Sequence, residues 1–155
     1  MGAEHYLCQA IRLAHANVKK GGRPFGALVV KGSDIIATGV NEVVGTNDPT
    51  AHAELLAIRA ASQKLASPSL DGCAVYASGH PCPMCMAAMR LAGVREVTYA
   101  HSNDDAAPYG LSTATVFADL AKPFSEQSMM ISYLPARLES APDLYAEWVR
   151  KQSAD

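Results

Sequence analysis

Two short stretches of the chain carry residues of the types and spacing that bind a metal. Residues 50–54 read Thr-Ala-His-Ala-Glu and residues 81–85 read Pro-Cys-Pro-Met-Cys. Zinc prefers imidazole and thiolate ligands, and three protein ligands leave its fourth tetrahedral position open, as in catalytic sites. The sequence therefore predicts a Zn²⁺ ion held by His52, Cys82 and Cys85, with Glu54 as a nearby carboxylate that is not a ligand.

The pairing of His-x-Glu with Pro-Cys-x-x-Cys indicates the chemistry. This pair of motifs is the signature of zinc-dependent deaminases. In that chemistry a metal-activated water attacks an amidine-like ring carbon, and ammonia leaves. Glu54 is the predicted general base, which takes the proton of the water, passes it to the ring nitrogen and then helps to protonate the departing ammonia. Both motifs are expected at helix N-termini, whose positive ends stabilise thiolates.

Two other interpretations of these residues remain open from the sequence. The Cys-x-x-Cys pair is also found in redox dithiols, although no partner motif supports that role here. The trio could also belong to a closed structural zinc site, and the protein would then be a zinc-binding module without activity. The fourth ligand would come from one of several residues elsewhere in the chain: His80, His101, Cys73 or Asp48. The paired motifs favour the catalytic zinc.

Length and composition bound the class of protein. The chain has 155 residues, 49% hydrophobic and 18% charged, which suits one domain over residues 1–155. No apolar run is long enough to span a membrane, and Glu4, His5 and Arg12 interrupt the N-terminal stretch, which argues against a secretory leader. The net charge of −2 gives no bulk electrostatic reason to bind nucleic acid.

The remaining two cysteines suggest a compartment. Cys8 and Cys73 fall in apolar stretches and are expected to be buried thiols. With no sign of a disulfide framework, a reducing cytoplasmic location fits best.

Hydrophobic periodicity and turn residues predict an alternation of helices and strands. Strands 73–77 and 95–100 are separated by a helix, so they should be parallel, whereas strands 25–30 and 35–40 form a hairpin. A polar loop is expected over 101–113. The order predicts an α/β fold, a three-layer α-β-α sandwich with a mixed five-stranded sheet. The other expected elements are helices 4–19, 50–66, 83–92, 114–121 and 142–151 and a fifth strand, 128–134.

At these motifs the chain resembles the cytidine and deoxycytidylate deaminase-like superfamily, from Pro24 to about Tyr133. Residues 22–27, 47–54 and 105–107 look most similar to bacterial guanine deaminases, although tRNA adenosine deaminases share the middle stretch. The resemblance implies a cytidine deaminase-like fold, a homodimer, and a small-molecule nucleobase substrate. The implied reaction is the zinc-dependent conversion of guanine to xanthine and ammonia.

The resemblance also implies roles for individual residues. Asn41 would hydrogen-bond the substrate ring, Phe25 would stack on it, and His52 would lie against it as well as bind zinc. Asp105 would accept hydrogen bonds from the guanine N1–H and 2-amino group, with Asp104 as the alternative in register. The competing interpretation is that these aspartates cap a turn or a helix.

Two departures from the family pattern widen the choice of substrate. His80 stands where many relatives have glutamate, and it could line the pocket. The chain has no aromatic residue at its C-terminus, so Tyr145 or Trp148 would close the site, or the pocket would be more open. An open pocket would admit cytosine, guanosine or a pterin-like ring. A tRNA adenosine deaminase is disfavoured, because Arg150 and Lys151 are the only cations in residues 142–155.

Overall fold

The structure, a computed structural model, describes residues 2–154, which fall into two compact units that divide after Ala121. The first unit contains the sheet and the motifs singled out above. The second contains a short 3₁₀ helix, η2 (Phe124–Glu126), and one α-helix, α7 (Leu144–Gln152). The single domain over 1–155 stays a prediction.

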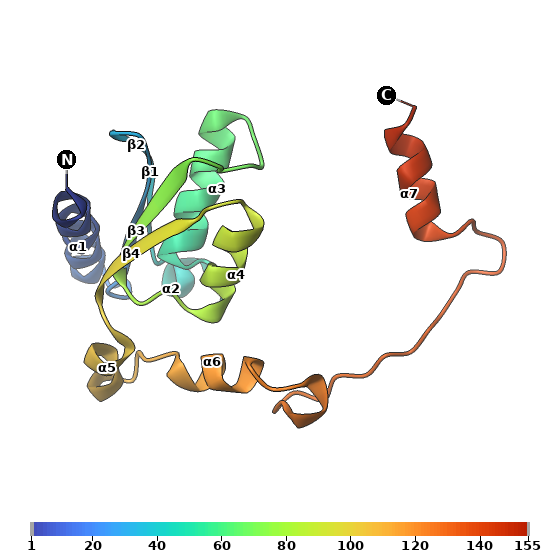
Figure 1. Ribbon diagram of the computed structural model, residues 1–155. Helices are drawn as coiled ribbons and strands as arrows, with labels where there is room; N and C mark the ends of the chain where they lie inside the picture. The colour runs from blue at the N-terminus through green and yellow to red at the C-terminus, as the bar shows by residue number, and fades with distance from the viewer. Residues whose placement is uncertain (1, 155) are drawn as a thin grey trace. The chain divides into compact units, whose positions relative to one another are not determined.

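The first unit follows the predicted alternation of elements (Figure 1). The segment expected to be a loop over 101–113 contains two short helices, because Ser102 caps the first of them. In chain order the elements are α1 (Ala3–Lys19), β1 (Gly26–Lys31), β2 (Asp34–Val40), α2 (Val43–Thr46), α3 (Ala53–Leu65), β3 (Cys73–Gly79), α4 (Pro83–Leu91), β4 (Glu96–His101), α5 (Asn103–Ala106), η1 (Ala107–Tyr109) and α6 (Ala114–Leu120).

The strands form one mixed sheet in the order β2-β1-β3-β4. β1 is antiparallel to both β2 and β3, and β3 and β4 are parallel, which confirms the predicted hairpin and the predicted crossover. Ala77 is opposite Ala27 on one side and Tyr99 on the other. The C-terminal ends of β3 and β4 therefore lie side by side and lead into the Pro-Cys-x-x-Cys stretch and into α5.

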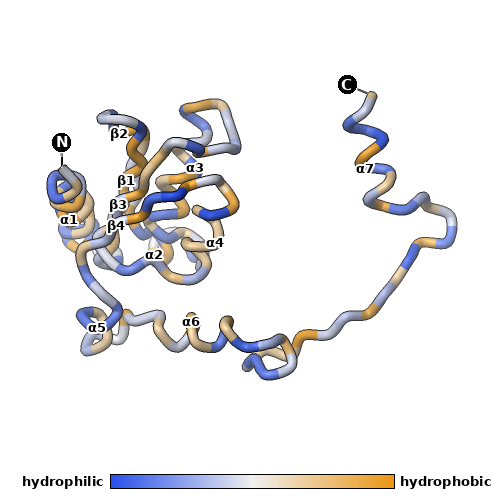
Figure 2. Tube along the Cα trace, in the orientation of Figure 1, coloured by the Kyte–Doolittle hydropathy of each residue, from blue (hydrophilic) through white to orange (hydrophobic). Residues whose placement is uncertain are grey.

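Helices cover both faces of the sheet, which confirms the three-layer sandwich. α1 lies on one face and α3 and α4 lie on the other (Figure 1). Alternate side chains of β1 point to opposite faces, so Leu28 and Val30 pack with Tyr6 under α1 whereas Ala27 and Val29 pack under α3. Burial on both faces explains the nearly continuous hydrophobic runs of β1 and β3 (Figure 2).

The prediction of a fifth strand over 128–134 is wrong. The sheet has four strands, and residues 128–134 are irregular. A strand is stable only where a neighbour satisfies its backbone N–H and C=O groups, and the second unit offers no strand to pair with in the part that the structure describes. Met130, Tyr133 and Leu134 are accordingly exposed.

The prediction that Cys8 is buried is also wrong, because its side chain is exposed. The buried face of α1 is formed by Tyr6, Ala10, Ala14 and Asn17, at helical spacing. Cys8 follows Tyr6 by two residues and so projects from a different side of the helix. Cys73 is buried at the start of β3, as predicted.

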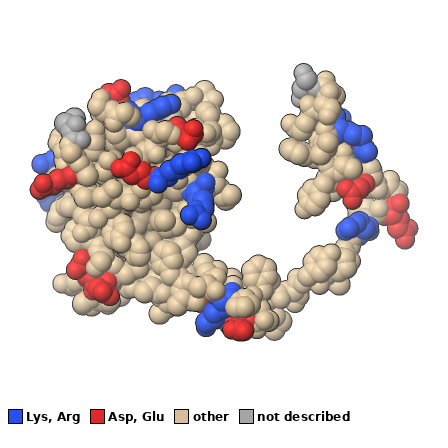
Figure 3. Space-filling view, in the orientation of Figure 1, with Lys and Arg blue, Asp and Glu red and all other residues tan. Residues whose placement is uncertain are grey.

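Surface charge and helix length bear on possible partners. Acidic and basic side chains are interspersed over the face of the first unit shown in Figure 3, where no broad basic patch is visible. None of the described helices is long and apolar enough to cross a membrane.

Candidate active site

The first residues of α3 and α4 bring the two motifs together. His52 occupies the N-cap position of α3 and Cys82 that of α4, both with extended backbone, and Pro83 follows at the first helical position, where proline is favoured. Cys85 lies in the first turn of α4. Both helices therefore direct their positive N-terminal ends at the ligand atoms, as the sequence predicted.

The three predicted ligand atoms have the separations that zinc requires. His52 Nδ1 lies 3.4 Å from Cys82 Sγ and 3.6 Å from Cys85 Sγ, and the two sulfurs are 3.5 Å apart. Ordinary zinc–ligand bond lengths in a tetrahedron give about 3.6 Å between nitrogen and sulfur and about 3.8 Å between sulfurs. Within the described residues this metal-ligating cluster consists of these three residues alone, so no fourth ligand closes it.

The thiols are already polarised by their neighbours. The hydrogen bond between the two sulfurs, assisted by His52, lowers the pKa of Cys82 to about 4. The same contact and burial raise the pKa of Cys85, and the bond to Cys82 raises the pKa of His52. One thiolate is thus available for a metal at neutral pH.

Glu54 lies beside the ligands but outside the ligand cluster. Its side chain is 5% exposed, and Cys85 Sγ donates to Glu54 Oε2 over 3.4 Å. Burial raises the pKa of the Glu54 carboxyl above its ordinary value. A buried carboxylate with a raised pKa accepts protons more readily than an exposed one, which suits a general base.

A cavity of about 190 Å³, called the zinc cavity below, opens onto these residues. Of the residues predicted to bind substrate, Phe25, Asn41 and His80 line it. The Asn41 N–H donates to the Phe25 carbonyl over 3.1 Å, so these two residues are tied to each other. The other lining residues are Arg23, His52, Glu54, Cys82, Gly110, Leu111, Ser112 and Thr113.

Comparison with known proteins agrees with this geometry. Residues 2–101 match the family described as the cytidine and deoxycytidylate deaminase zinc-binding region. The chain belongs to this deaminase family. It is 43% identical to the guanine deaminase of Bacillus subtilis over 130 residues, 83% of either chain, and 36% identical to a tRNA-specific adenosine deaminase of Aquifex aeolicus over 97% of this chain and 96% of that one. The solved structure of the Bacillus subtilis guanine deaminase aligns with a TM-score of 0.82 at 37% identity, covering all of this chain and 96% of that one.

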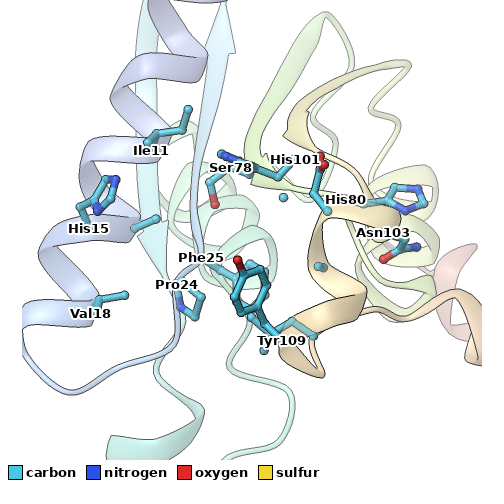
Figure 4. A pocket seen from close by; sticks show the side chains of 15 residues that line it. Ile11, His15, Val18, Pro24, Phe25, Ser78, His80, His101, Asn103 and Tyr109 are labelled. Atoms are coloured by element: carbon cyan, nitrogen blue, oxygen red, sulfur yellow. The ribbon is translucent and has the colours of Figure 1, made fainter.

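The protein is thus a zinc-dependent deaminase, and its remaining predicted site residues lie elsewhere. Asp105 lines a second, largely apolar cavity of about 380 Å³ next to the zinc cavity. In Figure 4, Ile11 and His15 of α1 lie on one side of this second cavity and His80 on the other, with Phe25 between them. Phe25 and His80 line both cavities.

Asp105 makes a complete capping box in this deaminase. Its Oδ2 accepts the Ser102 N–H over 2.8 Å, and its own N–H donates to Ser102 Oγ over 3.1 Å. This is the capping role that competed with substrate recognition in the sequence. Trp148 lies in α7, in the second unit, with its ring 62% exposed, and its role as a lid stays a prediction.

Several residues of the deaminase site were not predicted from the sequence. Arg23 lines the zinc cavity, and its charge counteracts the rise in the pKa of His52. The buried amide of Asn17 donates from Nδ2 to the carbonyls of Arg23 and Asn41, each over 2.8 Å. Arg23 could have been predicted because it directly precedes the Pro-Phe-Gly-Ala stretch. No sequence pattern around Asn17 indicates that it supports the site.

Proposed function

We propose that this deaminase converts guanine to xanthine and ammonia. The similarity to the guanine deaminase of Bacillus subtilis, over 83% of both chains, carries the proposal. The composition of the zinc cavity supports it, because an aromatic ring, an amide and a cation surround the catalytic carboxylate. A flat heterocycle with several acceptors would find a ring to stack on one face and hydrogen-bond donors for its acceptors.

Proton transfer is the part of the reaction that the chain's own residues perform. His52, Cys82 and Cys85 would hold Zn²⁺, which when bound acts as a Lewis acid toward water. Glu54 takes a proton from the attacking water and delivers it to the ring nitrogen beside the attacked carbon. It then takes the remaining proton of the added oxygen and passes it to the amine, which departs as ammonia while the ring carbonyl forms. The balance is guanine plus water to xanthine plus ammonia.

Three side chains are proposed to bind the ring. Phe25 stacks on one face. The Oδ1 of Asn41 already accepts the Val43 N–H over 3.1 Å, so its amide NH₂ is the end left to donate to a ring acceptor. Arg23 is proposed to meet the O6 and N7 acceptors, the edge of guanine that arginine pairs with most readily.

The remaining predicted substrate-binding residues, Asp105, His80 and Trp148, complete this proposal. Asp105 would accept the N1–H through Oδ1 while Oδ2 keeps its capping contact with Ser102, and His80 would close the cavity beside Cys82. The proposed role of Trp148 as a lid rests on the sequence alone. An Asp105→Asn variant tests the first of these roles. A fall in guanine turnover of less than about tenfold, the equivalent of 1.4 kcal/mol, would leave Asp105 as a cap alone.

The experiment that tests the substrate is ammonia release by zinc-loaded protein. The panel is guanine, guanosine, cytosine, cytidine, adenine and adenosine, with 2-aminopurine added because it lacks O6. We expect turnover of guanine alone among the six natural compounds. Arg23→Gln should slow guanine more than 2-aminopurine. Turnover of cytosine or of a nucleoside instead would keep the deaminase mechanism and overturn guanine as the substrate.

The tRNA substrate is the alternative that the comparisons leave in view. A net charge of −2 argues against it, because phosphate contacts require clustered cations. A gel-shift with tRNA at increasing salt tests this point. Tight binding that weakens steeply with salt would favour the tRNA reaction over guanine.

We also propose a homodimer that acts in purine metabolism in the cytoplasm. Leu91 and Met86 of α4 are 90% and 38% exposed, and Tyr99 of β4 is 42% exposed; such exposed apolar side chains support a contact with a second subunit. The four cysteines are free thiols, which supports a reducing compartment. Light scattering at micromolar concentration should give twice the chain mass, and a monomer would refute the dimer.

A further inference from the structure

One wall of the zinc cavity is a short segment with few attachments. Gly110, Leu111, Ser112 and Thr113 form this wall, between η1 and α6. The segment turns at Gly110, whose φ of 71° is a conformation that favours glycine. The Leu111 N–H donates to the Ala106 carbonyl over 3.2 Å, which fixes the start of the wall.

Asn103 fixes the end of this wall. Its Oδ1 accepts the Thr113 N–H over 3.1 Å and lies 3.5 Å from Thr113 Oγ1, which also donates to it. Thr113 is the N-cap residue of α6, yet its hydroxyl makes no capping bond to α6. A threonine at this position ordinarily caps its own helix, so its hydroxyl has instead been turned toward Asn103.

The position of Asn103 is itself well determined. It is the first residue of α5, directly after Ser102, and the capping box of Ser102 with Asp105 fixes the backbone there. Asn103 therefore offers its carbonyl oxygen from a rigid position next to the end of β4. In Figure 4 its side chain lies on the same side of the second cavity as His80.

A stacking contact holds the chain beyond the wall. The Phe117 ring of α6 stacks on the His80 ring with centroids 5.3 Å apart and planes at 12°. His80 in turn lies against Tyr99 of β4, with centroids 4.6 Å apart. The wall is thus fixed by backbone bonds at Gly110 and Leu111, by Asn103 at Thr113, and by one ring contact at Phe117.

We propose that Asn103 is a positioning residue that holds the 110–113 wall against the zinc cavity and thereby sets the affinity for the substrate base. Asn103 does not line the zinc cavity and acts through Thr113. The wall lines the cavity but contributes neither a metal ligand nor the proposed base, so its loss should raise KM and leave kcat nearly unchanged. This inference rests on the proposed deamination of guanine.

The test compares two substitutions of nearly the same size. Asn103→Leu removes the acceptor oxygen, whereas Asn103→Asp keeps an acceptor at the same place and is compatible with the N-terminal turn of α5. For the leucine variant we expect KM for guanine to rise about five- to tenfold, the scale of one or two hydrogen bonds, with kcat within about twofold of the parent. The aspartate variant should restore KM to within about twofold.

Hydrogen exchange provides a readout that does not need activity. In Asn103→Leu, peptides covering 110–117 should exchange faster, whereas peptides from α3 and β3 keep their protection. Zinc content should match the parent. Equal exchange of the wall in the leucine and parent proteins, or equal KM in the leucine and aspartate variants, would overturn the inference.

These outcomes separate failure of the inference from failure of the proposed substrate. If the parent does not turn over guanine but does turn over another compound of the panel, the KM comparison is made with that compound. If the parent acts on none of them, faster exchange of the wall in the leucine variant and its recovery in the aspartate variant still support the positioning role. A fall in kcat together with lost zinc would instead show general damage to the site and overturn it.

Discussion

Cys85 and Glu54 lie in the first turns of α4 and α3, with Sγ and Oε2 3.4 Å apart. The contact joins a predicted metal ligand to the proposed general base, although neither motif contains both residues. It holds the carboxylate next to the metal position while leaving Glu54 outside the ligand cluster. Removal of the base and removal of the metal should therefore have separable effects.

Glu54→Gln keeps the size of the side chain and removes its ability to take a proton. We expect guanine turnover to fall by about 10²- to 10⁴-fold, the usual range for a general base, with full zinc content. Ammonia release and metal analysis of the same sample measure both quantities. Retention of turnover within tenfold would contradict the role of Glu54 as the base.

Zinc removal should expose a reactive thiol at Cys82. Because hydrogen bonding lowers the Cys82 pKa to about 4, the metal-free protein should hold a thiolate there even at pH 6. A thiol reagent at pH 6, followed by peptide mapping, should label Cys82 ahead of the buried Cys73, and bound zinc should protect it. Exposed Cys8 serves as the control for accessibility. Equal labelling of Cys82 with and without zinc would be the contrary result.

The Asp105 carboxyl should remain ionised to unusually low pH. The backbone N–H of Ser102 lowers the pKa of Asp105 below its ordinary value of 3.8. A depressed folded-state pKa means that the capping bond contributes to stability above the unfolded pKa and is lost as pH falls through the folded one. NMR titration of Asp105 and of the Ser102 amide should show a common midpoint below 3.8. A midpoint at or above 3.8 would show that the capping box does not persist in solution.

Gly79 lets the Phe25 ring approach the end of β3. A Cβ at Gly79 would lie 3.2 Å from Phe25 Cε1 and 3.3 Å from Cδ1, tighter than an ordinary contact. Gly79→Ala should therefore push the ring by a few tenths of an ångström and raise KM for guanine by about two- to fivefold, with smaller effects on kcat. Gly2→Ala, where an added Cβ meets nothing within 4 Å, is the matched control. Parent-like kinetics in Gly79→Ala would show that Phe25 does not depend on this contact.

The sequence by itself determined the chemistry of the site. The His52, Cys82 and Cys85 cluster could be predicted because ligand type and spacing are local properties, and because helix N-termini can be recognised from their flanking residues. The role of Glu54 as the base stays a prediction. The hairpin, the parallel pair and the three layers also followed from local periodicity. The helix begins at Ala53 and not at residue 50, so His52 lies at the N-cap and not in the first turn; helix boundaries are the part of a sequence-based prediction that shifts most readily.

Tertiary structure decided the rest, because those features depend on contacts between distant residues. The strand expected over 128–134 has the composition of a strand but no partner to pair with. Cys8 lies in an apolar stretch but projects from the exposed side of α1. Folding places Asn17 beside Asn41, Arg23 beside His52 and Asn103 beside Thr113. These contacts join residues that are distant in the sequence, so no local pattern predicts them.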